Sequence, residues 1–254
     1  MLDMDGTIYL GEKLLPGARE TFDHFENAGL QYLILTNNSS KHRGQYGEKL
    51  RRLGLDISDE KIFTSGEATA IYLQRDRPNA QVYLVGTPAL EEEFAARGFI
   101  LDHDRPEVAV LGFDTTLTYD KLWRLCDLVR DGIPYVATHP DFNCPVEGGF
   151  MPDIGAMIAF VEASTGRRPD VVIGKPNPPI VEAVQEKTGL PLEAICMVGD
   201  RLYTDVALGA AGIKTILTLS GEATLEDLRT SPNQPDAVID NLADLAAALS
   251  KLGK

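Results

Sequence analysis

An alternation of short β-rich runs with longer helical stretches, from one end of the chain to the other, most constrains its fold. This pattern is typical of a mostly parallel sheet covered by helices. The β-rich runs predict strands at 32–35, 82–85, 108–111, 135–137, 171–173, 195–198, 215–217 and 237–239. The stretches between them predict helices at 16–28, 42–53, 119–130, 155–165, 179–187 and 204–211. The sequence therefore predicts an α/β fold.

The segment from about Ala68 to Asp170 has its own set of alternating elements, which indicates an insertion into the main sheet. We expect residues 1–67 and 171–254 to form the main domain and residues 68–170 to form a second α/β domain. A chain of 254 residues is long enough to bury a core in each.

Charge and composition exclude several classes of function. A formal net charge of -14 disfavours nucleic acid, whose affinity depends on Lys and Arg. The sequence has neither a run of 18 apolar residues nor a basic start followed by an apolar stretch, so we expect no membrane span, no signal peptide and a cytoplasmic location. Three cysteines without CxxC spacing argue against disulfides and zinc.

Polar clusters follow three of the predicted strands, and a fourth cluster opens the chain. Ligands bind outside the carboxyl ends of parallel strands, so we expect these loops to converge on one edge of the sheet. Each loop alone has a simpler explanation: a turn, a helix cap, a solvated lysine or a residue that favours a helix N-terminus. Together they are hard to explain without a common site. The clusters contain Asp3 and Asp5, then Thr36, Asn37, Asn38 and Ser39, then Lys175, then Asp200 and Asp205.

These residue types fit phosphoryl chemistry. Three aspartates suit a hard cation such as Mg²⁺, and a lysine with several N–H and O–H donors suits phosphate oxygens. Asp3 is the candidate nucleophile, forming an aspartyl-phosphate, and Asp5 the candidate general acid and base. Gly6 lets the backbone turn so that both carboxylates reach one space.

The motifs Asp3-Met4-Asp5-Gly6-Thr7, Thr36-Asn37-Asn38, Gly174-Lys175-Pro176 and Gly199-Asp200 through Asp205 resemble, in this order, those of the haloacid dehalogenase-like superfamily. The long insertion and the stretch ATHPDFNCPVEGGFMPDIGAMIAFVEASTGRRPDVVIGKP resemble its NagD-type, or p-nitrophenylphosphatase, branch. The resemblance covers nearly the whole chain. It implies a Rossmann-like three-layer core, a mobile α/β cap and Mg²⁺-dependent phosphatase activity.

The resemblance also assigns roles by position. It implies that the side chains of Asp3 and Asp200 and the backbone carbonyl of Asp5 bind the metal, supported by Asp205. It implies that the phosphate is held by Thr36, Asn37, Asn38 and Lys175. The expected partner is a small phosphorylated metabolite, and a homodimer is left open.

The inserted domain is where substrates must be distinguished, because the core motifs contact only the phosphate. The segment 138–149 follows a predicted strand, and we expect it to be a loop that reaches the leaving group of sugar phosphates or nucleoside monophosphates. The polar candidates for reading substrate hydroxyls are His139, Asp141, Asn143 and Glu147.

Two positions depart from the pattern of the branch. His139 stands where Asn is common, and it either contacts substrate or fills a turn. Asp153 stands where Gly is expected, and it either caps the next helix or places a negative charge that disfavours a polyanionic substrate.

Alternative functions are a phosphotransferase or phosphomutase, and a non-catalytic phosphometabolite-binding module. Asp5 argues against a dehalogenase, because a halide leaving group needs no proton. Mutases resemble members with a helical cap just after the first motif, where this chain has only some 30 residues between Asp3 and Thr36. A binding module would hold several unpaired carboxylates together without chemistry, which is costly.

The start of the chain raises one more expectation. Only Met1 and Leu2 precede Asp3, and a strand of two residues cannot pair along its neighbours. The sequence therefore predicts further apolar residues upstream.

We predict that Asp3→Asn removes turnover while the fold is kept, because an amide cannot form the acyl-phosphate. Asp5→Asn should slow turnover by roughly 10²- to 10⁴-fold, the scale of general acid-base catalysis. Steady-state kinetics with p-nitrophenyl phosphate tests both, and more than a few per cent of wild-type rate in Asp3→Asn would refute the nucleophile assignment.

Overall fold

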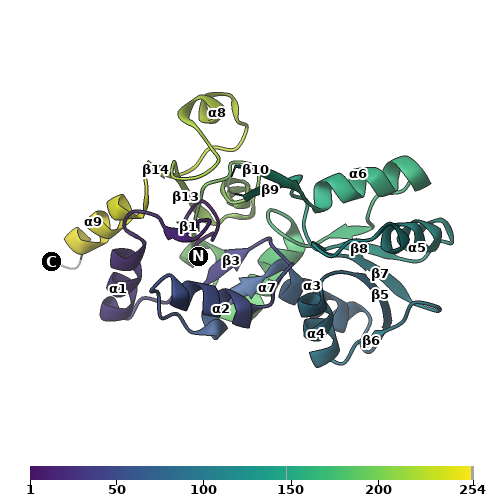
Figure 1. Ribbon diagram of the computed structural model, residues 1–254. Helices are drawn as coiled ribbons and strands as arrows, with labels where there is room; N and C mark the ends of the chain where they lie inside the picture. Colours follow the sequence, from purple (N-terminus) through teal and green to yellow (C-terminus); the bar gives the residue numbers. More distant parts are fainter. Residues whose placement is uncertain (147, 253–254) are drawn as a thin grey trace. The chain divides into compact units, whose positions relative to one another are not determined.

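The computed structural model describes residues 1–146 and 148–252, which form two compact units. Unit 1 consists of Met1–Thr36, Arg43–Phe63 and Val184–Lys254, and unit 2 of Asn37–His42 and Thr64–Ala183. The predicted α/β class is confirmed, because parallel strands alternate with helices in both units (Figure 1).

Unit 1 is built on parallel strands with helices after them. Its strands are β1 (Tyr9–Leu10), β2 (Lys13–Leu14), β3 (Ile34–Thr36), β4 (Ile62–Thr64, ending at the unit boundary), β12 (Cys196–Gly199), β13 (Lys214–Thr218) and β14 (Ala237–Ile239). Its helices are α1 (Ala18–Ala28), α2 (Arg43–Arg52), α8 (Leu225–Thr230), α9 (Leu242–Leu252) and the 3-10 helices at Asp59–Lys61, Leu192–Ala194 and Val206–Ala211. Helix α7 (Pro178–Thr188) runs from unit 2 into unit 1.

Leu2 lies between two strands of unit 1, in parallel pairing with Ile34 of β3 on one side and Val198 of β12 on the other. The N–H of Leu35 donates to the carbonyl of Leu2 at 2.8 Å, and the N–H of Asp3 donates to the carbonyl of Val198 at 2.8 Å. Strands β12, β13 and β14 follow in parallel order, and β3 pairs with β4. The start of the chain is thus held inside the sheet.

The core of unit 1 packs α1 and α9 side by side, as Figure 1 shows. Phe22 of α1 lies edge-on to Tyr32 with ring centroids 5.2 Å apart, and both belong to the same apolar cluster as Leu242 of α9. Leu2 and Ile34 are also fully buried in it. Burial of these side chains keeps Asp3, the residue after Leu2, in place at the edge of the sheet.

Unit 2 has a five-stranded parallel sheet in the order β11-β8-β7-β5-β6. Its strands are β5 (Gln81–Val85), β6 (Ile100–Leu101), β7 (Val108–Leu111), β8 (Tyr135–Ala137) and β11 (Val171–Val172), with a separate hairpin of β9 (Asn143–Val146) and β10 (Gly149–Pro152). Its helices are α3 (Ser65–Asp76), α4 (Pro88–Ala96), α5 (Tyr119–Arg130) and α6 (Ile154–Thr165). Helices α5 and α6 cover one face of the sheet, and α3 and α4 lie on the other (Figure 1).

Three details differ from the prediction. The strand before Lys175, β11, pairs with β8 of unit 2 instead of with the strands that carry Asp3 and Asp200. The predicted helix at 204–211 is a 3-10 helix at Val206–Ala211. The expected loop at 138–149 is wrong in its second half, where β9 pairs antiparallel with β10.

The differences at β11 and at the hairpin have separate physical reasons. Valine-rich runs as short as β11 do not reveal which neighbour they join, because their register is set by long-range contacts such as the 2.7 Å bond from the Asp170 N–H to the Tyr135 carbonyl. Each strand of the hairpin contains a proline, and neither shows the alternation typical of a strand, so no strand was predicted there.

None of the helices in the described parts of the chain is long and apolar enough to cross a lipid bilayer.

We predict that Gly17→Ala destabilises the protein much more than Gly29→Ala. Both glycines flank α1 with positive φ, 79° and 64°, where alanine costs about 1–2 kcal/mol. A Cβ at Gly17 would also lie 1.9 Å from the backbone nitrogen of Ala243, whereas nothing lies within 4 Å at Gly29. Urea unfolding measures both, and equal losses would show that α9 moves aside freely.

Candidate functional site

Three aspartates of unit 1 form a cluster, here called the acidic cluster: Asp3, Asp200 and Asp205. One carboxylate oxygen of each lies within 4.8 Å of those of the others. Asp3 follows Leu2 inside the sheet, and Asp200 follows β12, the strand beside it. Two parallel neighbours therefore end with a carboxylate at the same edge, as the sequence predicted for these residues.

Asp205 joins the cluster through a short turn after β12. Its Oδ2 accepts the Arg201 N–H at 3.1 Å, and the side chain lies against Gly199, where a Cβ would come 2.3 Å from the Asp205 Cγ. Asp205 is the residue before the 3-10 helix at Val206–Ala211 and makes no side-chain cap to it. Its carboxylate is thus directed to the cluster instead of to the helix.

Asp200 is the most constrained member of the acidic cluster, with only 2 % of its surface exposed. Its Oδ2 accepts the Glu222 N–H at 2.7 Å, whereas its buried Oδ1 has no hydrogen-bond partner among the described residues. Two glycines leave it room, since a Cβ at Gly6 or Gly221 would come within 2.3 Å and 1.9 Å of Oδ2. Burial, then the charges of Asp3 and Asp205, raise the pKa of Asp200 well above its usual value.

A divalent cation fits this cluster. Its donors are carboxylate oxygens, which hard cations prefer, and the buried Asp200 Oδ1 is an acceptor that a cation would satisfy. Burial and then the charges of Asp3 and Asp205 raise the Asp200 pKa, and the positive charge of a cation would oppose both effects.

Asp5 and Thr36 lie at the same edge of unit 1. Asp5 is half-buried in a tight turn in which the Gly6 N–H donates to the Tyr9 carbonyl at 2.8 Å and Gly6 has a φ of 89°. Thr36 is the buried last residue of β3. The turn after Asp3 thus redirects the chain, as the glycine predicted.

In unit 2, Asn37 and Lys175 are joined by hydrogen bonds in both directions. The Lys175 N–H donates to Asn37 Oδ1 at 2.8 Å, and Asn37 Nδ2 donates to the Lys175 carbonyl at 3.1 Å. Asn37 Nδ2 also donates to Asp141 Oδ1 at 2.9 Å. Lys175 is buried, with 2 % of its surface exposed, so it is not a solvated surface lysine.

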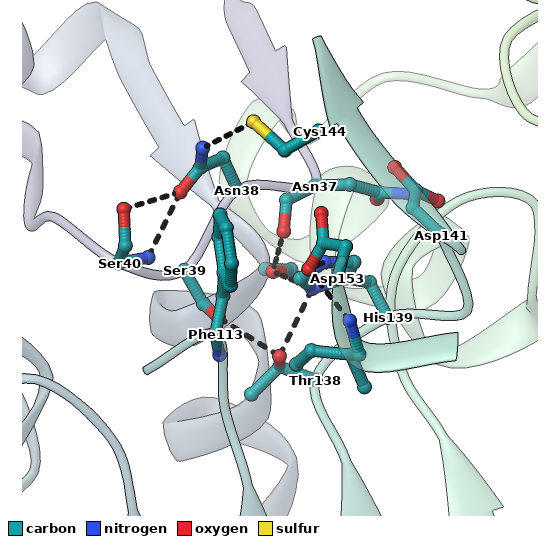
Figure 2. A network of polar contacts seen from close by, with 12 residues as sticks. Asn37, Asn38, Ser39, Ser40, Phe113, Thr138, His139, Asp141, Cys144 and Asp153 are labelled. Carbon is teal, nitrogen blue, oxygen red and sulfur yellow. Dashed lines mark hydrogen bonds and ion pairs between the residues drawn. The ribbon is translucent and has the colours of Figure 1, made fainter. Parts of the chain in front are cut away.

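The segment 37–42 is held by residues at the carboxyl ends of the unit 2 strands. Ser39 Oγ lies 2.9 Å from Thr138 Oγ1, and the Phe113 N–H donates to Ser39 Oγ at 2.9 Å (Figure 2). The Ser65 hydroxyl donates to the Asn37 carbonyl. Thr138 and Ser65 were not identified from the sequence; the one available signal for Thr138 was its place directly after a predicted strand.

His139 and Asp153 form a buried pair in the same network (Figure 2). His139 Nε2 lies 2.9 Å from Asp153 Oδ1, and His139 Nδ1 lies 3.0 Å from Thr138 Oγ1. The Ile154 N–H donates to Asp153 Oδ1 at 2.7 Å, which makes Asp153 the N-cap of α6. The cap interpretation of Asp153 is therefore confirmed.

His139 and Asp153 also lie within 4.8 Å of Asp141, a geometry that could hold a metal ion. The hydrogen bonds to Asn37, Thr138 and Ile154 already account for the placement of these polar atoms.

The remaining candidates are spread out. Asn38 Oδ1 accepts the Ser40 N–H at 2.9 Å and the Ser40 hydroxyl at 2.7 Å, a local turn. Asn143 is exposed on β9, opposite Pro152. Glu147 lies outside the described residues.

Comparisons with known proteins agree with this architecture. Family models described as "Haloacid dehalogenase-like hydrolase" and "HAD-hyrolase-like" match residues 1–100 and 172–245. The chain is 36 % identical to an acid sugar phosphatase of Staphylococcus aureus over 99 % of this chain and 97 % of that protein. The chain belongs to the haloacid dehalogenase-like hydrolase family.

Solved structures place the chain within that family. A 4-nitrophenylphosphatase from Thermotoga maritima has a TM-score of 0.94 and 48 % identity, over 98 % of this chain and 95 % of that one. NagD from E. coli K-12 has a TM-score of 0.88 and 32 % identity, over 96 % of each chain. The resemblance to the NagD-type branch is thus confirmed.

The raised pKa of Asp200 predicts a pH-dependent stability. Because the folded protein holds this proton more tightly than the unfolded chain, ionisation of Asp200 destabilises the fold. Without metal, the free energy of unfolding therefore falls as pH rises from about 4 through the raised pKa. The fall is at most about 1.4 kcal/mol per pH unit. Asp200→Asn should remove it.

Urea unfolding of wild type and Asp200→Asn in EDTA, over a pH series, measures the difference. We expect the free energy of unfolding of the variant, relative to that of the wild type, to increase as pH rises. We also expect Mg²⁺ to stabilise the wild type more than the variant. A difference that does not change with pH would contradict the assigned ionisation.

Proposed function

We propose that this phosphoric monoester hydrolase releases inorganic phosphate from small sugar phosphates or nucleoside monophosphates, with Mg²⁺ as cofactor. The acidic cluster carries the proposal: three aspartates within 4.8 Å, one with a buried oxygen that has no hydrogen-bond partner among the described residues. The similarity to an acid sugar phosphatase of Staphylococcus aureus supports sugar phosphates as substrates.

Asp3 is the proposed nucleophile. The bond from its N–H to the Val198 carbonyl holds its backbone beside β12, and its carboxylate lies within 4.8 Å of those of Asp200 and Asp205. Attack of Asp3 on phosphorus forms an aspartyl-phosphate and releases the alcohol, and water then cleaves this intermediate. Two smaller barriers replace one very large barrier.

Asp5 is the proposed general acid and base. It would protonate the leaving oxygen in the first step and take a proton from the attacking water in the second. Asp5 lies two residues after Asp3 and directly before the turn at Gly6, whose φ is 89°.

The phosphate oxygens are assigned to Thr36, Asn37, Asn38 and Lys175. Asn37 would contribute its backbone N–H, because both hydrogens of its side-chain NH₂ are donated to the Lys175 carbonyl and to Asp141 Oδ1. Lys175 supplies a positive charge against the overall negative charge of the chain, and Thr36 and Asn37 follow one another at the end of β3. Bonds between Asn37 and the Lys175 backbone keep the amide and the lysine together. A monoester's charge is thus matched by donors rather than by carboxylates.

Asp3 and Asp200 would hold Mg²⁺ by their side chains and Asp5 by its backbone carbonyl, with Asp205 supporting them. When bound, the metal supplies positive charge that offsets repulsion between the substrate and an anionic nucleophile.

We predict phosphate release from p-nitrophenyl phosphate and from at least one sugar phosphate or nucleoside monophosphate, abolished by EDTA and restored by Mg²⁺. The reason is that the acidic cluster without a cation repels the substrate. Colorimetric phosphate assays over a metabolite panel measure it, with Asp3→Asn as the inactive control. Equal rates in EDTA would remove Mg²⁺ from the proposal, and transfer of phosphate to a second metabolite instead of water would indicate a phosphotransferase.

A further inference from the structure

The Asn37 side chain is held in one orientation by three hydrogen bonds. Its Oδ1 accepts from the Lys175 N–H, and its Nδ2 donates to the Lys175 carbonyl and to Asp141 Oδ1. An ionised carboxylate can only accept, so Asp141 would repel the amide oxygen if the amide turned over. The carboxylate therefore specifies the orientation that also matches both backbone groups of Lys175.

Asp141 is itself fixed. Its surface is 3 % exposed, and its carbonyl accepts the Gly155 N–H at 2.7 Å. Gly155 allows this close approach, because a Cβ there would lie 2.5 Å from the Pro140 carbonyl oxygen. The next residue, Phe142, accepts the Asp153 N–H at 2.9 Å. The start of α6 thus anchors the segment that carries the carboxylate.

The other side of Asn37 is equally close. A Cβ at Gly174 would come 2.6 Å from Asn37 Oδ1 and 2.6 Å from the Cβ of His139. The Gly174 N–H donates to the Thr138 carbonyl at 2.8 Å. The strand end that carries Thr138 and His139 therefore contacts both the glycine before Lys175 and, through Asp141, the amide of Asn37.

We propose that Asp141 is a positioning residue that acts through Asn37 on the Lys175 segment. The inference rests on the proposed function, in which Asn37 and Lys175 hold the phosphate. It replaces the hypothesis that Asp141 recognises the leaving group. All substrates share the phosphate, so a carboxylate that orients the residues binding this phosphate affects all substrates alike.

The first test compares two substrates of different leaving group. Asp141→Ala should lower kcat/KM for p-nitrophenyl phosphate and for glycerol phosphate by the same factor, at least tenfold, and should weaken inhibition by inorganic phosphate. Asp141→Asn keeps an acceptor oxygen and should recover most of the loss. Asp120→Ala, which removes an exposed carboxylate of unit 2, is the matched control and should change neither rate.

The second test asks whether the effect passes through Asn37. In an Asn37→Ala background, Asp141→Ala should cost less than about twofold, since the amide it orients is gone. Independently of turnover, the side-chain NH₂ signal of Asn37, identified by its loss in Asn37→Ala, should move in Asp141→Ala and not in Asp120→Ala. If Asp141→Ala does not fold, Asp141→Glu displaces the carboxylate by one methylene and should give the same equal losses.

A loss confined to glycerol phosphate would overturn the proposal and return Asp141 to leaving-group recognition. Additive losses in the double variant, or an unchanged Asn37 signal, would also overturn it. If the wild type hydrolyses no monoester, the proposed function fails, and the Asn37 signal alone then decides whether Asp141 orients the amide.

Discussion

Mutual repulsion among Asp3, Asp200 and Asp205 is the constraint around which unit 1 is built. Three carboxylates within 4.8 Å are unfavourable wherever water is excluded: burial, and then the charges of Asp3 and Asp205, raise the pKa of Asp200. The chain can hold them because their backbones are fixed by other interactions. Parallel pairing of Leu2 and Val198 fixes Asp3 and Asp200, and glycines at positions 6, 199 and 221 leave space for the side chains.

Unit 2 differs from unit 1 in that it buries a lysine, Lys175, and a side-chain amide, that of Asn37. Asn37 bonds to both backbone groups of Lys175, and Ser39 bonds to the ends of β7 and β8. The segment 37–42 thus belongs, by its contacts, with the inserted elements, although it directly follows β3 of unit 1. The hydrogen bonds of Asn37 and Ser39 are therefore made within unit 2.

Motifs, strand ends and fold class could be predicted because each rests on local sequence. Strands β7, β8 and β14 lie at the predicted residues, since β-branched runs bounded by turns are unambiguous there. The partner strand of β11 and the hydrogen bond between Asn37 and Asp141 could not be predicted, because both depend on contacts between residues far apart in the chain. Asn37 and Asp141, for example, are 104 residues apart. The hairpin of β9 and β10 was missed because its exposed, proline-containing strands lack alternation.

Substrate discrimination must then use groups that the network leaves accessible. His139, Asp141 and Asp153 are buried and bonded to Thr138, Asn37 and Ile154, so reading a substrate hydroxyl would require breaking existing hydrogen bonds. The hairpin that follows is different: Asn143 and Phe150 are exposed on β9 and β10. Cys144 of β9 packs against the core of unit 2, and its Sγ accepts from Asn38 Nδ2 at 3.8 Å, whereas the exposed side chains of the hairpin can vary without disturbing the Asn37 amide. Under the proposed function, the residue that orients Asn37 and the exposed side chains that would contact the leaving group lie on one stretch of chain, 138–152, but on different parts of it.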